Sequence, residues 1–462
     1  MSVLGERVAA GLKFPTGFVW GASTAAFQIE GSTTVDGRTD SSWDAFCRRP
    51  GAIAGGDTGD PAADHYRRYR EDVALMRELG LGTYRFSLAW SRVRPDGGKV
   101  NPPGLDFYDR LVDELLANGI RPWATLYHFD LPQALEADGG WANRDTAYHF
   151  AGFAEAAAER LGDRIPLWST LNEPWCSAFL GYGSGVHAPG RQDPEAAVAA
   201  AHHLLLAHGL GMAELRRHAP AAESGITLNL YPVQGPDPEA VRKIDGLMNR
   251  LFMDPVLLGR YPEDVLADLA PFGFGELVRD GDLGLISTPI DMLGVNYYRG
   301  YEVTREPVPG SEPAGPEWIG AGEVRFIPDP DAPRTDSGWQ VEPGKLTDTL
   351  VSVHRDYPHI PLYVTENGAA YPDVTDADGQ IADKDRIAFL DAHLRAAHAA
   401  LARGVDLRGY FYWSLLDNFE WAEGYAKRFG LVHVDYETQR RTLKQSADFY
   451  AKVIAANALP GL

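Results

Sequence analysis

Short apolar runs alternate with amphipathic stretches along the whole chain. The runs are apolar on both faces, which is typical of buried parallel strands. They cover residues 18–22, 83–87, 121–126, 167–172, 225–230, 292–296, 362–365 and 409–413. Between them, apolar residues recur three or four positions apart, as in Tyr66, Tyr69, Val73, Met76 and Leu79. That spacing predicts helices with one buried face.

Eight strand–helix units in succession predict an α/β fold, a single (β/α)₈ TIM barrel over residues 1–462. The competing fold is a doubly wound sheet, but no Gly-x-Gly-x-x-Gly follows an early strand. Two connections are long, residues 31–64 and residues 301–345, and the second is rich in Pro and Gly. We expect both to be irregular βα loops that cover the C-terminal rim of the barrel.

Polar and aromatic residues stand at or just after most of the predicted strand ends. The carboxyl ends of barrel strands meet at one rim, so these side chains should face a common site. They are Gln28, Arg85, His128, Asn172, Glu173, Asn296, Tyr298, Glu366, Trp413, Glu420 and Trp421. Taken singly, each could be a core or strand-end residue, as a Trp on an apolar run such as Trp123 usually is. Their convergence on one rim favours a functional site.

Two glutamates among them suit the cleavage of a glycosidic bond. Glu173 lies in Asn-Glu-Pro at residues 172–174, and Glu366 lies in Thr-Glu-Asn-Gly at residues 365–368. The reaction needs one protonated carboxyl at the leaving oxygen and one ionised carboxylate at the sugar. We interpret Glu173 as the general acid/base and Glu366 as the nucleophile.

The remaining rim residues fit supporting roles around this pair. Arg85 is a charge partner that would keep Glu366 ionised, and the Tyr298 hydroxyl could donate to the same carboxylate. Asn172 suits the sugar 2-hydroxyl. Trp413 offers an apolar platform beneath a pyranose ring. Donors and acceptors for the other sugar hydroxyls are Gln28, His128, Glu420 and Trp421.

Composition narrows the class of partner. The chain has 462 residues, and 43 basic against 64 acidic residues give a net charge of −21. Such an acidic surface disfavours nucleic acid and anionic membranes. The two cysteines, Cys47 and Cys176, match no disulfide framework or zinc-ligand spacing, so we expect no metal site and a reducing compartment. We also expect no signal peptide, no membrane helix and a cytoplasmic location, and the pattern predicts no particular oligomeric state.

Several ordered motifs resemble glycoside hydrolase family 1, the β-glucosidase family, over nearly the whole chain. They lie at residues 14–31, 84–87, 127–132, 172–174, 296–298, 365–368 and 413–421. The resemblance implies a retaining double-displacement mechanism without a cofactor. It also implies β-glucosidase activity on small β-glycosides or short oligosaccharides, with β-galactosidase or β-fucosidase activity beside it.

The same resemblance implies two groups of binding residues. The glycone subsite would consist of Gln28, His128, Asn172, Asn296, Tyr298, Trp413, Glu420 and Trp421. The aglycone entrance would include Trp175, His187 and Trp339. The segment Trp413-Ser414 is similar to one that carries a cis peptide bond in this family.

Two alternatives remain at the level of sequence. A 6-phospho-β-glucosidase would need residues suited to a sugar phosphate near Glu420 and Trp421, where this chain has Glu423, although Lys427 is close in sequence. A non-catalytic glycan-binding barrel would be expected to lack one of the two carboxylates. Both Glu173 and Glu366 are present, which favours an enzyme.

Overall fold

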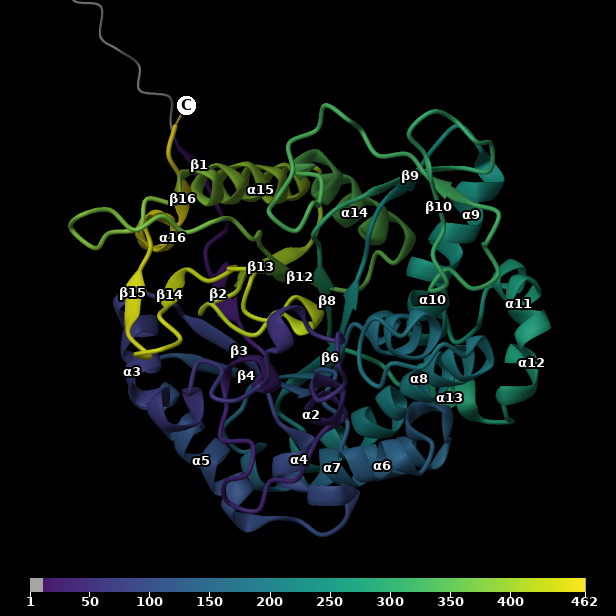
Figure 1. Cartoon of the computed structure of the whole chain (residues 1–462), viewed down its shortest axis with the longest axis horizontal. Coiled ribbons are helices and arrows are strands. Elements are labelled where there is room, and N and C mark those ends of the chain that lie inside the picture. The colour runs from purple at the N-terminus through teal and green to yellow at the C-terminus, as the bar shows by residue number, and fades with distance from the viewer. Residues whose placement is uncertain (1–10, 462) are drawn as a thin grey trace, which may run out of the picture.

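Eight parallel strands close into a barrel in the computed structural model, which describes residues 11–461 (Figure 1). The barrel strands are β2 (Val19–Ser23), β3 (Thr83–Ser87), β4 (Arg121–Tyr127), β5 (Leu167–Asn172), β6 (Glu223–Asn229), β8 (Met292–Asn296), β12 (Leu362–Asn367) and β13 (Leu407–Trp413). Strand β13 pairs with both β12 and β2, which closes the ring. The predicted (β/α)₈ barrel is confirmed. The predicted single domain over residues 1–462 also includes residues 1–10 and 462, which lie outside the described residues.

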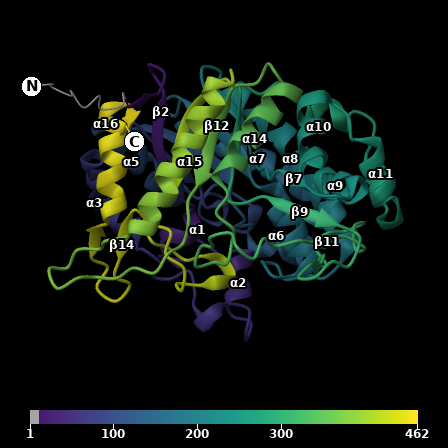
Figure 2. The same cartoon turned by 90° about the horizontal axis from the view of Figure 1, so that it is seen from above.

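Helices surround the barrel (Figures 1 and 2). The long helices are α3 (His65–Glu78), α5 (Pro102–Ala117), α7 (Asp145–Leu161), α8 (Pro194–His218), α14 (Pro343–Asp356), α15 (Lys384–Ala402) and α16 (Gln445–Ala456). The shorter ones are α1 (Ala26–Ile29), α2 (Ser42–Cys47), α4 (Trp90–Val93), α6 (Gln133–Ala137), α9 (Pro238–Asp245), α10 (Leu251–Leu258), α11 (Glu263–Leu269), α12 (Phe274–Leu277) and α13 (Asp282–Ile286). The helix predicted from the spacing of residues 66–79 is α3.

All eight predicted strands are present, with shifts at their polar ends. Strand β6 begins at Glu223, which pairs with Leu167, and β12 continues to Asn367. The apolar pattern does not mark these ends because a ladder of backbone hydrogen bonds can extend over polar residues. As a result, Glu366 lies within β12, opposite Asn296 of β8, and not after the strand.

The two long connections differ from the irregular loops that we expected. The first, residues 31–64, contains α2. The second contributes β9 (Tyr301–Thr304), β10 (Glu312–Pro313) and β11 (Arg325–Phe326) to a separate sheet with β7 (Val233–Gln234), in the order β10-β11-β9-β7. Strands of two residues are too short to show an alternating pattern, so the sequence gives no signal for them.

The interior of the barrel is filled by large side chains from different strands. The Trp123 ring meets the rings of Tyr363 and Phe411 edge to face, with centroid distances of 5.1 and 5.0 Å. Trp123 is therefore a core residue, as its place on an apolar run predicts. A β-carbon on Gly21 would lie 2.3 Å from the Phe411 ring, so only glycine fits at this point of β2.

Helix α8 contradicts the expectation that no segment has the length and apolarity of a membrane helix. Within residues 11–461 it is the one helix that meets both criteria, with 25 residues and a mean hydropathy of 1.3 in its most apolar window. However, 83% of that window is buried inside the protein. It packs on α7 and on the segment after β5. Burial on this scale is typical of a core helix.

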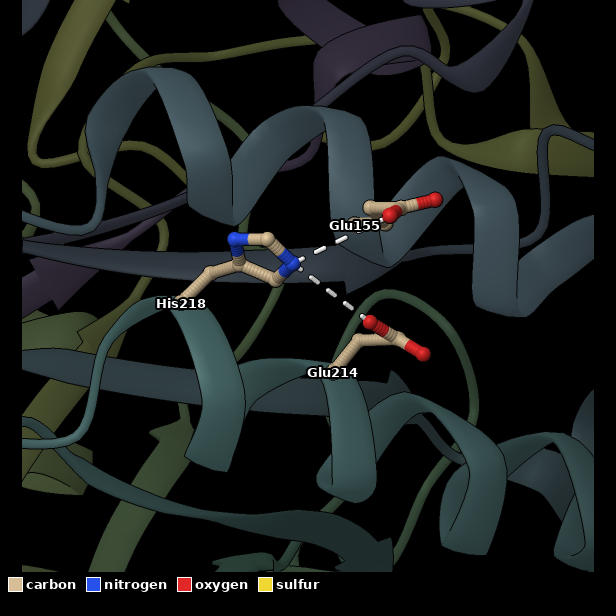
Figure 3. Close-up of side chains that lie close together, drawn as sticks. All are labelled: Glu155, Glu214 and His218. Atoms are coloured by element: carbon tan, nitrogen blue, oxygen red, sulfur yellow. Dashed lines mark ion pairs between the residues drawn. The ribbon is translucent and has the colours of Figure 1, made fainter.

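Glu155 of α7 forms a cluster with Glu214 and His218 at the end of α8 (Figure 3). The His218 Nε2 lies 3.9 Å from a Glu155 oxygen and 3.6 Å from a Glu214 oxygen. The three groups are close enough to hold an ion, but Arg217 already lies 3.8 and 3.7 Å from the same carboxylates. Because partly exposed pairs contribute only about 0–1 kcal/mol, we treat the cluster as a weak helix–helix contact.

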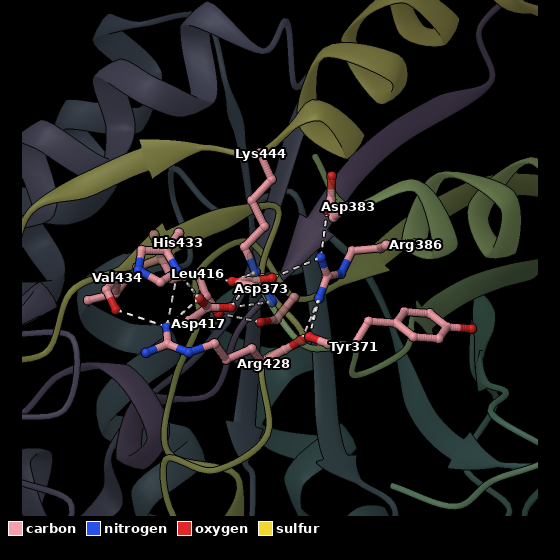
Figure 4. A network of polar contacts seen from close by, with 12 residues as sticks. Tyr371, Asp373, Asp383, Arg386, Leu416, Asp417, Arg428, His433, Val434 and Lys444 are labelled. Carbon is pink, nitrogen blue, oxygen red and sulfur yellow. Dashed lines mark hydrogen bonds and ion pairs between the residues drawn. The ribbon is translucent and has the colours of Figure 1, made fainter. Parts of the chain in front are cut away.

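A buried ionic network joins the segment after β12 to the segment after β13 (Figure 4). The Lys444 ammonium lies 2.7 Å from Asp373 and 2.8 Å from Asp417. The Arg428 guanidinium donates to Asp417 at 2.7 Å, and His433 contacts Asp373 at 2.9 Å. Burial alone would raise the pKa of Asp417, but the Lys444 and Arg428 charges hold that pKa well below its usual range. These cations occupy the place that a metal ion would need between the carboxylates.

Replacement of Lys444 by Met should therefore destabilise the protein. Asp373 and Asp417 would lose a buried cation, so we expect the free energy of unfolding to fall by about 3–5 kcal/mol at neutral pH. The depressed pKa of Asp417 stabilises the fold above the unfolded value of about 3.9, and this contribution disappears as the pH falls through the folded pKa. Urea unfolding followed by tryptophan fluorescence measures the change.

The matched control is Arg408→Met, because Arg408 and Asp406 form a pair in which both side chains are 47% exposed. We expect a change below about 1 kcal/mol for this variant. Equal effects of the two substitutions would contradict a stabilising role for the buried network.

Candidate active site

A pocket of about 870 Å³ opens at the carboxyl ends of the barrel strands. This volume suits a small-molecule ligand. Predicted site residues that line it are His128, Glu173, Tyr298, Glu366, Trp413, Glu420 and Trp421, together with the entrance residues Trp175, His187 and Trp339. The predicted residues Gln28, Arg85, Asn172 and Asn296 are buried around its floor through contacts with these side chains. The structure thus brings the whole predicted set together.

Glu366 is held by two donors from other strand ends. The Arg85 Nη1 donates to Glu366 Oε1 at 2.7 Å, and the Tyr298 hydroxyl donates to Oε2 at 2.8 Å. The Arg85 side chain has no exposed surface. One charged donor and one neutral donor therefore stabilise the ionised form of Glu366, as the sequence predicts.

Asn172 links this pair to His128. Its Oδ1 accepts from Arg85 Nη2 at 2.6 Å and from Asn296 Nδ2 at 3.1 Å, so its Nδ2 must face His128 Nε2, 3.1 Å away. Burial holds the pKa of His128 well below its usual range, so the ring is neutral. The network assigns the ring proton to Nδ1, which has no partner among residues 11–461 and can donate to a ligand.

Glu173 directly follows β5 in a left-handed backbone conformation, with φ of 44°. This conformation is unfavourable for a residue with a side chain and is typical of functional sites. Its carboxylate accepts from Asn296 Nδ2 at 2.7 Å and from the Cys176 thiol at 3.1 Å, and both donors are neutral. Burial, followed by the negative charge of Glu366, raises the pKa of Glu173 to about 7.

The two carboxyls therefore have unequal surroundings. Burial also raises the pKa of Glu366, but the Arg85 charge and the Tyr298 hydrogen bond oppose that rise. No cation within residues 11–461 forms an ion pair with Glu173, and the negative charge of Glu366 favours the protonated form of Glu173. This arrangement allows one carboxyl to hold a proton while the other remains ionised.

Cys176 contacts the site although no sequence pattern assigns it a role. It lies three positions after Glu173, and Asn229 Nδ2 donates to its sulfur at 3.6 Å. Burial raises the pKa of the thiol well above its usual range, so the group stays protonated and acts as a donor. The spacing of three residues from Glu173 is the one sequence signal that could have placed Cys176 beside this carboxyl. Cys176 does more than fill space, because its thiol donates a hydrogen bond to Glu173.

Gln28 and Glu420 form a second polar wall. The Gln28 Nε2 donates to Phe419 O at 2.8 Å and to Glu420 Oε2 at 3.4 Å, while its Oε1 has no partner among the described residues. Burial and the charges of Glu366 and Glu173 raise the pKa of Glu420 to about 8. At neutral pH this carboxyl can therefore donate as well as accept, which suits a sugar hydroxyl.

Aromatic rings complete the pocket on both sides. Trp413 stacks against His128 with a centroid distance of 5.6 Å, and its peptide bond to Ser414 is cis, as the family resemblance implies. On the outer side, Trp175 packs against Trp318 at 5.1 Å. Trp318 lies in the connection of residues 301–345, where no regular pattern distinguishes pocket residues from others.

Comparison with known proteins gives the same assignment. The family described as Glycosyl hydrolase family 1 matches residues 11–459. The chain is 51% identical to thermostable beta-glucosidase B of Thermobispora bispora, over 98% of this chain and 92% of that protein. It is 48% identical to the bifunctional beta-D-glucosidase/beta-D-fucosidase of Bifidobacterium breve, over 96% of this chain and 98% of that protein.

Solved structures agree with these relatives. The psychrophilic beta-glucosidase BglU of Micrococcus antarcticus superposes with a TM-score of 0.94 at 53% identity, covering 96% of this chain and 98% of that one. The family 1 β-glucosidase of Thermotoga maritima gives a TM-score of 0.91 at 43% identity, covering 97% and 99%. The chain therefore belongs to glycosyl hydrolase family 1, and its activity is that of a β-glucosidase, a retaining glycoside hydrolase.

Proposed function

We propose that the chain releases terminal β-D-glucosyl residues from small β-glycosides and short oligosaccharides, with Glu366 as the nucleophile and Glu173 as the acid/base. The observation that carries these roles is the unequal hydrogen bonding of the two carboxyls. Glu366 contacts the Arg85 guanidinium at 2.7 Å, whereas the donors to Glu173 in the described part of the chain, Asn296 and Cys176, are both neutral. The nucleophile must be an anion, and the acid must carry a proton.

In the first step, a Glu366 oxygen forms a bond to the anomeric carbon while the bond to the leaving oxygen breaks. Glu173 gives its proton to that oxygen, so the aglycone leaves as a neutral alcohol. Formation of the ester removes the negative charge of Glu366. Since that charge raises the pKa of Glu173, its loss lowers the pKa and leaves Glu173 as a carboxylate.

In the second step, ionised Glu173 takes a proton from a water molecule. The water oxygen bonds to the anomeric carbon, and the Glu366 carboxylate leaves. The product keeps the β configuration because the carbon is inverted twice. The Arg85 and Tyr298 donors favour this step because they stabilise the departing carboxylate.

The same geometry supports a glycone subsite. The donor Nδ1 of His128, the free Oε1 of Gln28 and the Glu420 carboxyl are the groups that we assign to sugar hydroxyls. The second hydrogen of Asn172 Nδ2 is available for the 2-hydroxyl, and the Trp413 ring would lie beneath the pyranose. Asn296 supports this wall by holding both Asn172 and Glu173.

Two observations bear on related substrates. The relative from Bifidobacterium breve is a bifunctional beta-D-glucosidase/beta-D-fucosidase, which supports acceptance of β-D-fucosides here. A 6-phosphate is disfavoured because the Glu423 carboxylate lines the pocket and Lys427 is held by Asp336, with a contact of 2.6 Å to its carbonyl oxygen. Like charges at close range cost several kcal/mol.

Substitution Glu366→Gly should lower the rate of hydrolysis of nitrophenyl β-D-glucoside by several orders of magnitude, because no carboxylate remains to attack the anomeric carbon. Added azide should enter the vacated space and give an α-glucosyl azide, which NMR identifies. The control Glu312→Gln changes an exposed carboxylate on the outer wall and should keep hydrolysis without response to azide. A β-configured azide from Glu366→Gly would refute the nucleophile assignment.

Substitution Glu173→Ala should discriminate between leaving groups. A dinitrophenyl glucoside needs no proton on departure, so its first step should change far less than that of an alkyl glucoside. In the wild type, kcat/KM should fall as the pH rises through about 7, since the raised pKa keeps the acid form up to that pH. This basic limb should disappear in the variant, and equal losses for both leaving groups would remove Glu173 from the acid role.

A panel of three nitrophenyl glycosides tests the glycone. We expect turnover of the β-D-glucoside and the β-D-fucoside, and a kcat/KM at least ~100-fold lower for the glucoside 6-phosphate. Faster hydrolysis of the phosphorylated substrate would favour a 6-phospho-β-glucosidase and overturn the proposed specificity.

A further inference from the structure

One cation on the outer side of the pocket has no role in the proposed mechanism. Arg299 directly follows Tyr298 and lines the pocket. Its guanidinium carbon lies 5.2 Å from the centre of the Tyr301 ring and 5.4 Å from that of Trp339. Its planar guanidinium thus lies beside aromatic side chains of the predicted aglycone entrance.

The groups around Arg299 leave its charge without a carboxylate. The phenol of Tyr301 forms a side-chain hydrogen bond with it, and the phenol of Tyr231 and the thiol of Cys176 are close enough to interact with its charge. No carboxylate within residues 11–461 forms an ion pair with it. Arg299 is half-buried, and its guanidinium carries five N–H donors, of which the single phenol oxygen of Tyr301 can accept only a part. Such donors facing a pocket point to an acceptor that arrives with the ligand.

A second pocket arginine shows the difference. Arg334 also lines the pocket, but its guanidinium donates to the carbonyl oxygens of Gly338 at 2.9 Å and Asp329 at 3.1 Å. The structure explains Arg334 as a support for its own loop. For Arg299, no backbone carbonyl or carboxylate within residues 11–461 accepts a hydrogen bond from the guanidinium, and the Tyr301 phenol is the one side chain that interacts with it in this way.

The position of Arg299 indicates which part of a substrate it would meet. Cys176 lies near Arg299 and also donates to Glu173, the carboxyl that we assign to protonation of the leaving oxygen. Arg299 therefore lies on the leaving-group side of the reaction centre. A group attached to the leaving oxygen would extend toward it, between Trp339 and Trp318.

We propose that Arg299 is a specificity-determining residue that binds a hydroxyl oxygen of a sugar aglycone. This inference rests on the proposed function. Donors beside aromatic faces suit a pyranose, because its hydroxyls accept hydrogen bonds and its C–H faces pack on rings. Glu302 and Glu317 also line this side of the pocket and disfavour an anionic aglycone, so a neutral polyol fits better than a carboxylate.

The test compares Arg299→Met with wild type on cellobiose, 4-carboxyphenyl β-D-glucoside and octyl β-D-glucoside. We expect kcat/KM for cellobiose to fall by about 10–100-fold, because a hydrogen bond from a charged donor is lost. The loss for octyl glucoside should be at least about fivefold smaller, since an alkyl chain offers no acceptor. The matched control Arg334→Met should change cellobiose and octyl glucoside by equal factors.

Equal losses of kcat/KM on all three substrates would overturn the inference. A loss confined to the carboxyphenyl glucoside would also overturn it, and would indicate that Arg299 binds an anionic aglycone instead of a polyol. If Arg299→Met does not fold, Arg299→Lys retains the charge but not the planar fork, and the same selective loss for cellobiose, smaller in size, is expected. Wild type that hydrolyses none of the glucosides would refute the proposed function itself. Wild-type turnover without a selective effect of the variants would refute only the role of Arg299.

Discussion

The buried guanidinium of Arg85 is the contact on which the site depends. Two buried carboxyls share one pocket, and without a cation neither would remain ionised there at low cost. Arg85 reaches Glu366 with one nitrogen and Asn172 with the other. The first contact decides which carboxyl is the anion. The second orients the Asn172 amide, which in turn determines the tautomer of His128.

Because Arg85, Asn172 and Glu366 come from β3, β5 and β12, the contact also spans the barrel. Side chains on neighbouring strands hold the floor in place: Thr365 donates to Asn296 at 2.7 Å, and Asn296 reaches Glu173. The positions of the reacting groups are therefore set by strand register and not by loop conformation. Precision of this kind is what catalysis by oriented groups requires.

The sequence predicts the catalytic floor of the site, which lies on the barrel strands, because the geometry of the barrel brings the strand ends together. Parallel strands of a closed barrel end at one rim, so Glu173 and Glu366 need only be placed at strand ends to be placed together. The apolar runs locate those ends to within a few residues. Even the difference between the two carboxyls is partly predictable, because Arg85 stands at the corresponding point of another strand.

The other half is not predictable from local patterns. Cys176, Arg299 and Trp318 lie in irregular or very short elements, where no period of two or 3.6 residues reports which side chains face the pocket. The same limit explains why the sequence predicts an irregular loop over residues 301–345, where the structure has β9, β10 and β11. Helix α8 has a clear sequence signal that allows two interpretations. Its composition is apolar, but only its packing in the structure distinguishes a core helix from a membrane span.

Because the outer wall of the pocket lies on the small sheet and the sugar-binding floor lies on the barrel, the two parts differ in how readily they tolerate mutation. Residues around the sugar are tied to the barrel core, so most substitutions there would disturb both folding and chemistry. The outer wall is built on strands of two to four residues that are separate from the barrel ladder. Mutations can accumulate in that wall with little effect on the catalytic floor. Enzymes with this architecture can therefore change their specificity for the leaving group while their specificity for the glycone and their mechanism stay constant.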